Sequence, residues 1–193
     1  MSQTPKEFYR SYAADDKLSE LSVELLHQIM KYDPVHVLDF GCGTGKHLSP
    51  LNGAGIATIG IDISPMNCYK AIHKYDLPCI ICSDETYLRN LCNVDAVFTC
   101  SVLDHIEAPY DIIEEFKRIA NKAVILAETD STGIGDYYFS HLYNAYGFRP
   151  LSFQYVGEDG AVYGLWVWEK VPATLTVGSN SMTFTNDAIP HRQ

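Results

Sequence analysis

The segment from Val35 to Lys46 constrains the fold of this chain more than any other stretch. Its apolar, β-branched first half is typical of a buried strand that ends at Asp39. Glycine then occupies every second position, at Gly41, Gly43 and Gly45. Glycine adopts positive φ readily and lets a ligand approach the backbone without a Cβ in the way. Residues 46–51 are compatible with a short helix, so we predict a strand–loop–helix pocket for a polar, partly anionic ligand.

Two common phosphate-binding motifs fail here on one residue each. A dinucleotide fingerprint needs a third glycine where Lys46 stands, and a nucleoside triphosphate loop needs Ser or Thr where His47 stands. The remaining pattern, an acid two residues before three alternating glycines, resembles motif I of the class I S-adenosylmethionine (SAM)-dependent methyltransferases over residues 38–45. An acid suits this ligand because SAM carries an ammonium and a sulfonium. The alternative is a glycine-rich turn that binds nothing.

A second acid strengthens this resemblance. The apolar run Ala57–Asp62 predicts a second strand, whose terminal Asp62 follows Gly45 by 17 residues. A carboxylate at this point accepts hydrogen bonds from two neighbouring ribose hydroxyls. The segment Gly60–Ser64 is similar to motif II of the same methyltransferases.

The composition and net charge of the chain limit the classes of molecule that it is expected to bind. The chain has 193 residues and a net charge of −10, which predicts one α/β domain and disfavours nucleic acid or an anionic membrane as a partner. No apolar stretch approaches the length of a membrane span, and the N-terminus does not resemble a signal peptide. The six cysteines are scattered, and we interpret the pair Cys79 and Cys82 as buried structural thiols rather than a metal site. We therefore expect a reduced, cytoplasmic protein.

The remaining periodicities predict an alternation of helices and strands. We expect helices over 18–31, 65–75 and 109–120, strands over 79–82, 94–101 and 123–128, and a hairpin of 153–156 with 161–170. Residues 85–91 follow Asp84 as a further helix. We divide the chain into an N-terminal helical lid segment (1–34), a SAM-binding methyltransferase domain (35–170) and a tail or added ribbon (171–193). The aromatic residues before the first helix, Tyr9 and Tyr12, either cover a pocket as a lid or anchor the N-terminus.

The resemblance implies an α/β fold: a Rossmann-like three-layer sandwich with a seven-stranded, mostly parallel sheet ending in an antiparallel hairpin. One departure is that residues 120–122 replace the Pro-Gly-Gly turn found in many relatives. SAM would lie across the carboxyl ends of the first four strands, with Asp39 on its ammonium, Asp62 on the ribose and Asp84 on the adenine; alternatively, Asp84 caps a helix. The cofactor-binding residues implied are Tyr12, Asp39, Gly41, Cys42, Gly43, Gly45, Asp62, Ile63, Asp84, Glu85, Cys100 and Ser101.

The segment after the fourth strand, Val102–Ile106, is similar to the family segment that lies beside the reacting methyl group. It lacks the Asn/Asp-Pro-Pro-aromatic tetrapeptide of the enzymes that methylate base amino groups. His105 is the first candidate for a general base because its ordinary pKa lies near neutrality; the alternative is a histidine that only packs on the cofactor. His141 and Tyr138, on an aromatic helix predicted over 137–146, are weaker candidates. We predict no metal.

These observations favour transfer of a methyl group from SAM to an oxygen or nitrogen of a small molecule, with a homodimer possible. A catalytically inactive SAM-binding regulatory or scaffolding subunit is the alternative. A nucleotide-dependent oxidoreductase is disfavoured by the missing third glycine of the dinucleotide fingerprint and by the predicted terminal hairpin.

Overall fold

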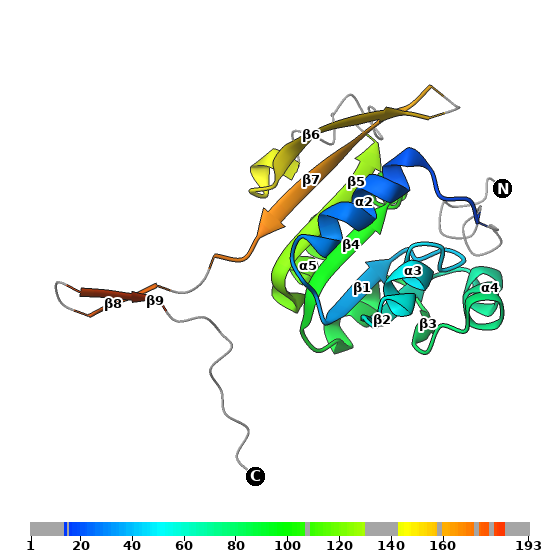
Figure 1. Ribbon diagram of the computed structural model, residues 1–193, viewed down its shortest axis with the longest axis horizontal. Helices are drawn as coiled ribbons and strands as arrows, with labels where there is room; N and C mark the ends of the chain where they lie inside the picture. Colours follow the sequence, from blue (N-terminus) through cyan, green and yellow to red (C-terminus); the bar gives the residue numbers. More distant parts are fainter. Residues whose placement is uncertain are drawn as a thin grey trace, which may run out of the picture.

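The protein folds around one twisted sheet with helices on both faces (Figure 1). The computed structural model describes residues 14, 16–106, 109–129, 143–157, 160–171, 174–177 and 180–183. The seven strands are β1 (His36–Phe40), β2 (Ala57–Asp62), β3 (Ile80–Cys82), β4 (Val94–Cys100), β5 (Ala120–Thr129), β6 (Arg149–Val156) and β7 (Val162–Glu169). Their order across the sheet is β3-β2-β1-β4-β5-β7-β6.

The first five strands are parallel, and β7 pairs antiparallel with both β5 and β6. The carboxyl ends of β1, β2, β4 and β5 therefore meet at one edge of the sheet, where ligands bind in open α/β folds. The predicted three-layer sandwich with a terminal antiparallel hairpin is confirmed. A separate two-stranded sheet consists of β8 (Thr174–Val177) and β9 (Asn180–Thr183).

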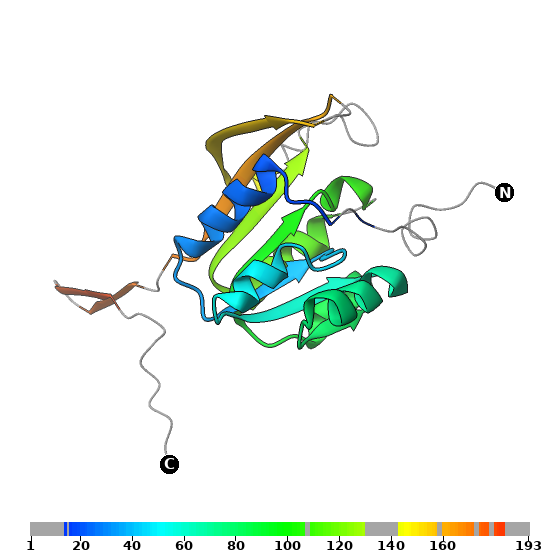
Figure 2. The same ribbon diagram turned by 45° about the vertical axis from the view of Figure 1, so that its right-hand side comes forward.

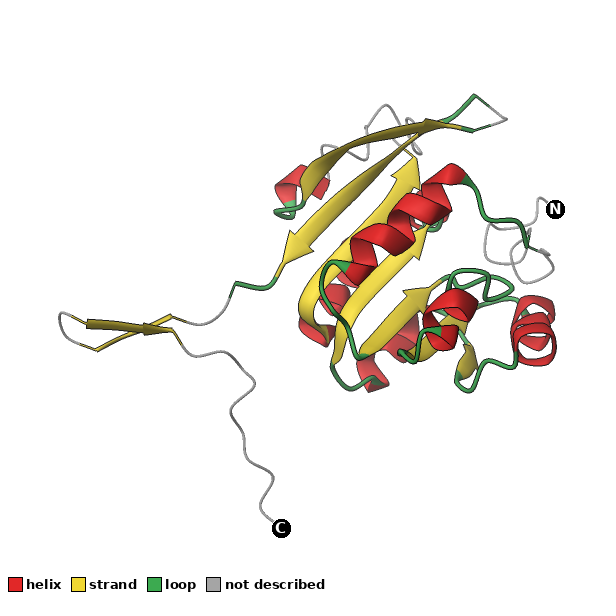
Figure 3. Ribbon diagram, in the orientation of Figure 1, coloured by secondary structure: helices red, strands yellow, loops and turns green. Residues whose placement is uncertain are grey.

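Alternating strand residues build two cores, one on each face of the sheet. On one face, Val37, Ala96 and Ile125 pack with helices α2 (Glu20–Met30) and α3 (Leu48–Gly53) and with Ala71 of α4 (Pro65–Tyr75). On the other face, Leu38, Val97 and Val124 pack with α5 (Tyr110–Ile119) and the 3₁₀ turn η1 (Glu85–Asn90). Figures 2 and 3 show the sheet between these helical layers. Strands buried on both faces explain the continuous apolar runs in the sequence.

Local signals fix the helix ends near the site. Ser64 caps α4 by accepting a hydrogen bond from the Asn67 N–H, and Pro65 occupies the first turn, where its missing N–H is not needed. The same helix ends at Asp76, which adopts the left-handed conformation (φ 52°). Helix α4 therefore begins three residues after Asp62 and keeps its first turn beside the β2 carboxyl end.

Several predicted helix and strand boundaries, and the predicted burial of two cysteines, were wrong. Residues 85–90 form a 3₁₀ helix, and α3 begins at Leu48 rather than Lys46. Residues 120–122 already belong to β5, because Ala120 pairs with Val94 ahead of a register shift. Cys79 is half-buried and Cys82 is exposed, both as free thiols, because β3 has only one neighbouring strand. The interpretation of this pair as buried thiols was therefore incorrect.

Candidate functional site

A cavity of about 750 Å³ opens at the carboxyl ends of β1, β2, β4 and β5. Its wall contains predicted cofactor-binding residues at or just after the carboxyl end of each of the first four strands, together with residues that were not predicted. The predicted residues on its wall are Gly41, Cys42, Gly43, Asp62, Ile63, Asp84, Glu85, Cys100, Ser101 and His105. Residues separated by more than 60 positions in the sequence thus share one concave surface, as the topology requires.

The glycine loop after β1 is held by the end of β2. The amides of Gly41 and Cys42 both donate to the Ile61 carbonyl oxygen, at 2.8 and 2.9 Å. Gly41 has a φ of 76°, and a Cβ at this position would lie 2.3 Å from Cγ2 of Val102. A side chain is therefore excluded both by backbone conformation and by the segment after β4.

Gly45 lies behind the cavity wall. It is not among the residues that line the cavity, and its Cβ would lie 2.4 Å from Cδ1 of Leu77 and 3.2 Å from Cβ of Ala71. The absence of a side chain at this third glycine therefore allows the loop to pack against α4 and the residues that follow it.

Asp62 is a nearly buried carboxylate surrounded by donors. Its Oδ2 accepts from the Gly43 amide at 2.8 Å, and its Oδ1 accepts from the Ser64 amide at 2.8 Å and the Asn67 side-chain amide at 3.3 Å. Burial raises the pKa of Asp62, while these three hydrogen bonds oppose the rise. The Asn67 carboxamide oxygen also accepts from the Ala14 amide at 3.0 Å, so it fastens the chain that precedes α2 to the cavity wall.

Asp39 and His47 form a buried pair next to the glycine loop. Asp39 is 0% exposed and does not line the cavity, whereas His47 lines it. Oδ2 of Asp39 lies 3.8 Å from Nδ1 of His47, and Nε2 of His47 lies 3.0 Å from the Ser22 hydroxyl on α2. Within the described part of the chain, neither Asp39 oxygen has a hydrogen-bond partner.

The two groups of this pair influence each other's protonation. Burial raises the pKa of Asp39, and the neighbouring His47 opposes the rise. For His47, burial acts against the charged imidazolium, but Cys100 and the Asp39 carboxylate outweigh it and raise the pKa to about 9. We therefore describe Asp39 and His47 as one buried acid–base pair whose imidazole side borders the cavity.

The carboxyl end of β3 contributes Asp84 and Glu85 to the wall. Asp84 caps η1, because its Oδ1 accepts from the Thr86 amide at 3.1 Å and from the Thr86 hydroxyl at 2.6 Å. The capping interpretation of Asp84 is thus confirmed, and it is compatible with a place on the cavity wall.

The segment after β4 closes the other side of the cavity. Ser101 has a φ of 57°, and its amide donates to the Ala127 carbonyl oxygen at 2.9 Å. The 3₁₀ turn η2 (Leu103–His105) follows, in which Nε2 of His105 lies 3.4 Å from Oδ1 of Asp104. The His105 side chain is 38% exposed and lines the cavity, so it is accessible to a bound molecule.

Glu128, which was not among the predicted site residues, holds this segment. Glu128 is fully buried at the end of β5 and accepts from the Val102 and Leu103 amides at 2.9 and 3.1 Å. It was treated only as the last residue of a predicted strand. The signal was present: Glu128, like Asp39 and Asp62, is an acid at the end of an apolar strand.

The cavity wall also contains residues that the sequence did not single out. The cavity is further lined by Ala14, Thr44, Lys46, His47, Asn67, Val102, Asp104, Thr129 and Tyr163. Three candidates, Tyr12, Tyr138 and His141, lie outside the described residues, as does most of the predicted aromatic helix.

In the part of the chain that the structure describes, no three His, Cys, Asp or Glu side chains are grouped as metal ligands. No helix in that part is long and apolar enough to cross a membrane.

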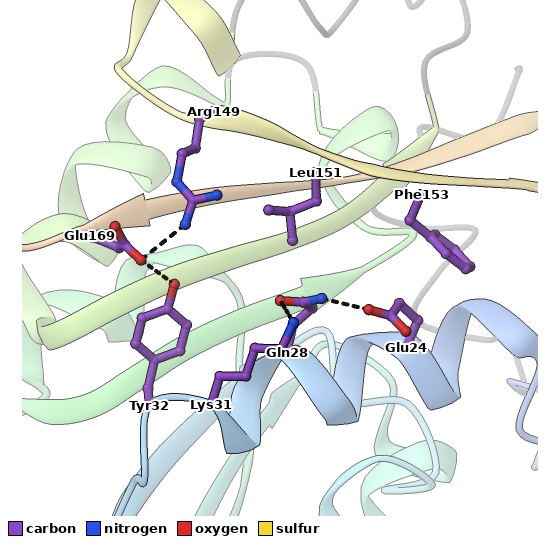
Figure 4. A pocket seen from close by; sticks show the side chains of 8 residues that line it. All are labelled: Glu24, Gln28, Lys31, Tyr32, Arg149, Leu151, Phe153 and Glu169. Carbon is purple, nitrogen blue, oxygen red and sulfur yellow. Dashed lines mark hydrogen bonds and ion pairs between the residues drawn. The ribbon is translucent and has the colours of Figure 1, made fainter.

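A second cavity of about 520 Å³ lies away from this edge, between α2 and the strands β6 and β7 (Figure 4). Its polar side chains satisfy one another. Glu169 accepts from the Tyr32 hydroxyl at 2.6 Å and from Arg149 at 3.0 Å, while Gln28 contacts both Glu24 and Lys31. The hydrogen bond from Tyr32, just after α2, to Glu169 of β7 links the end of this helix to the terminal hairpin.

Comparisons with known proteins agree with this geometry. The family model described as "Methyltransferase domain" matches residues 38–127. A curated relative, tRNA U34 carboxymethyltransferase from Hahella chejuensis, is 35% identical over 91 residues, which cover 42% of this chain and 27% of that protein. The match therefore spans about a quarter of the length of this curated relative.

Solved structures share the fold at low sequence identity. The N-methyltransferase NodS from Bradyrhizobium japonicum with S-adenosyl-L-homocysteine (SAH) has a TM-score of 0.66 at 15% identity, covering 87% of this chain and 98% of that one. Magnesium protoporphyrin IX methyltransferase from Synechocystis with SAH has a TM-score of 0.64 at 16% identity, covering 82% and 90%. The motifs, the topology and the matched region agree: residues 38–127 match a methyltransferase domain, and the chain shares the fold of SAM-dependent methyltransferases.

Proposed function

We propose that the chain binds SAM at the β1–β4 side of the cavity and transfers its methyl group to an oxygen or nitrogen of a small molecule. The supporting observation is the continuity of the cavity. One space extends from Asp62, Asp84 and Glu85 to His105, Thr129 and Tyr163. A nucleoside ligand at the first end leaves the second end for an acceptor beside it.

The residues present fit SAM. The wall carries acids at Asp62, Asp84, Glu85 and Asp104, which suits a ligand with both an ammonium and a sulfonium group. Asp39 lies behind this wall with carboxylate oxygens that have no hydrogen-bond partner among the described residues. We assign to Asp39 an electrostatic role toward the ammonium, exerted from behind the wall with His47 beside it.

SAM supplies a methyl group already activated by the sulfonium, so the chain mainly has to orient the acceptor and accept its proton. His105 is the proposed base because it is partly exposed and lies in the cavity. The Asp104 carboxylate at 3.4 Å orients the imidazole and stabilises the imidazolium that forms when the proton is taken.

A small-molecule acceptor is proposed on three grounds. The net charge of −10 and the acidic cavity wall oppose a polyanion, and similar folds include 1,6-didemethyltoxoflavin-N1-methyltransferase from Burkholderia thailandensis (TM-score 0.63, 15% identity, covering 78% of each chain). The curated relative's name makes tRNA the control acceptor. A cytoplasmic location, a homodimer and a metal-independent reaction belong to the same proposal.

Calorimetric titration with SAM and SAH tests the cofactor assignment. We expect micromolar binding to the wild type, lost in Asp62→Ala and kept in Asp111→Ala, an acid in the first turn of α5 outside the cavity. SAH release with a panel of small alcohols, phenols and amines then tests transfer, and tRNA serves as the contrasting acceptor. Absence of SAM binding by the wild type contradicts the proposal, whereas binding without any turnover favours the inactive regulatory subunit.

A further inference from the structure

Glu128 connects β5 to the segment that closes the cavity. Its Oε2 accepts from the amides of Val102 and Leu103, and its Oε1 lies 2.5 Å from the Thr99 hydroxyl on β4. All three partners lie 25 to 29 residues away in the sequence. Backbone amides in a turn such as 102–103 otherwise need water or another acceptor, so one carboxyl group satisfies two of them.

The segment held by Glu128 contacts the glycine loop directly. A Cβ on Gly41 would lie within 2.3 Å of Val102, so Val102 sits on the backbone of the loop that forms the proposed cofactor site. The next residues, Asp104 and His105, lie on the proposed acceptor side. Displacement of residues 102–103 therefore changes both ends of the cavity at once.

Glu128 does not itself reach the ligand. It is fully buried and is not among the residues that line the cavity, in contrast to Asp104 and His105. A direct role as the proton acceptor is therefore incompatible with its position, and its effect has to pass through the residues it holds.

We propose that Glu128 is a positioning residue: it fixes the backbone of residues 101–103 against the glycine loop, and so sets the shape of the proposed SAM and acceptor site. This inference takes SAM as the ligand from the proposed function, whereas the hydrogen bonds of Glu128 are independent of that function. It adds a residue at the end of β5 to a site that motif I and Asp62 define on β1 and β2.

The charge state of Glu128 determines the informative substitution. Burial and the nearby Asp104 raise its pKa to about 8, while its three hydrogen bonds lower it. Asp104 is the charged group facing Glu128 in the described part of the chain, and His105 lies next to Asp104. In the structure the Thr99 hydroxyl donates to Oε1 of Glu128, and both amides donate to Oε2. Glutamine can keep all three hydrogen bonds, because its carbonyl accepts from the two amides and its NH₂ donates to the Thr99 oxygen, which as a hydroxyl can also accept.

The experiment compares the full chain as wild type, Glu128→Gln and Glu128→Leu. Leucine fills a similar volume without an acceptor, which limits cavity formation and keeps the variant testable. Hydrogen exchange at the Val102 and Leu103 amides measures whether these amides stay hydrogen-bonded, and calorimetric titration measures the affinity for SAM. We expect Glu128→Gln to keep amide protection and SAM affinity within about twofold, and Glu128→Leu to lose both, with affinity falling about tenfold or more.

Three results overturn the proposal. Equal protection and affinity in all three proteins show that Glu128 holds nothing. Loss of SAH production in Glu128→Gln with SAM affinity unchanged shows a chemical rather than positioning role. Failure of Glu128→Leu to fold moves the test to Glu128→Asp, which withdraws the carboxyl group from the two amides by one methylene; unchanged exchange at residues 102 and 103 there contradicts the arrangement. If the wild type does not bind SAM, the proposed function fails, while the exchange data still decide whether Glu128 holds the segment.

Discussion

The two sides of the cavity are each organised by a buried carboxyl group at the end of a strand, but they are built differently. Asp62 of β2 accepts from Ser64, Asn67 and Gly43, residues within 19 positions of it. Glu128 of β5 accepts from β4 and the following turn, 25 to 29 positions away. The first side is held together by a motif that is contiguous in sequence, and the second by tertiary contacts.

The hydrogen-bond partners also differ in kind. All three groups around Asp62 are donors, and the Asn67 side chain cannot reverse without losing the Ala14 amide. One of the three groups around Glu128 is a hydroxyl, which can donate or accept. Asp62 therefore requires a group that accepts at both oxygens, whereas Glu128 tolerates a group that donates at one.

The contact between Gly41 and Val102, which joins the two sides of the cavity, gives the largest expected effect on the free energy of unfolding. Gly41→Ala places a methyl group against Val102 in a loop with positive φ, and we expect it to destabilise the protein by about 2–4 kcal/mol. Gly55→Ala is the matched control, because φ is 86° there but nothing lies within 4 Å of its Cβ. Its expected effect is about 1 kcal/mol. Urea unfolding measures both; equal losses would show that the contact with Val102 is unimportant.

Replacing each carboxyl group by the corresponding amide sharpens the comparison. Asp62→Asn places an NH₂ against a donor and leaves at least one amide unsatisfied, so we expect SAM affinity to fall about tenfold or more. Glu128→Gln is the matched change on the other side and keeps all three hydrogen bonds. Calorimetry on both variants tests the difference, and a similar loss in the two would contradict the distinction drawn between their partners.

The pH dependence of stability tests the environment of Glu128. The pKa of Glu128 is raised from its ordinary value of 4.5 to about 8, so the unfolded chain releases this proton at lower pH than the folded chain. Glu128 therefore contributes a loss of stability as pH rises from about 4.5 to 8. Melting curves of the wild type and Glu128→Gln should diverge over this range, the wild type falling faster. Asp39 and Asp62 titrate in both proteins, so parallel curves would contradict the raised pKa of Glu128.

The smallest expected effect on binding is at His105. Its side chain is 38% exposed, so His105→Gln should leave SAM affinity within about twofold. Turnover should nevertheless fall about 10²-fold or more if His105 removes the acceptor proton. Binding and SAH release measured on the same preparation distinguish these roles. Unchanged turnover would support the alternative that His105 only packs beside the cofactor.

The sequence predicted the parts of the molecule whose signals are local. The strand Ala57–Asp62 and the helix Pro65–Tyr75 match the structure residue for residue, because apolar periodicity and the Ser64–Pro65 cap define their ends. The place of Asp62 on the cavity wall follows from the same local pattern. The helical face Ile112, Ile113, Phe116 and Ile119 is buried as its periodicity predicts.

Features set by distant contacts could not be obtained in this way. Gly45 fits its motif by spacing, but its neighbours Leu77 and Ala71 decide that it packs inward. His47 interrupts a nucleotide motif in the sequence, and only the fold places it beside Asp39 and Ser22. Glu128 shows the same limitation, since its three partners are recruited by the pairing of β4 with β5.

The antiparallel insertion of β7 has a consequence for synthesis of the chain. One edge of β5 finds its partner only when residues 163–169 are available, about 40 residues after β5 itself. The last register pair, Thr129 with Tyr163, borders the cavity. On the ribosome the cofactor side is translated early, whereas the acceptor side waits for the hairpin. Until then β5 presents an unpaired edge, the kind of surface that chaperones shield in nascent chains.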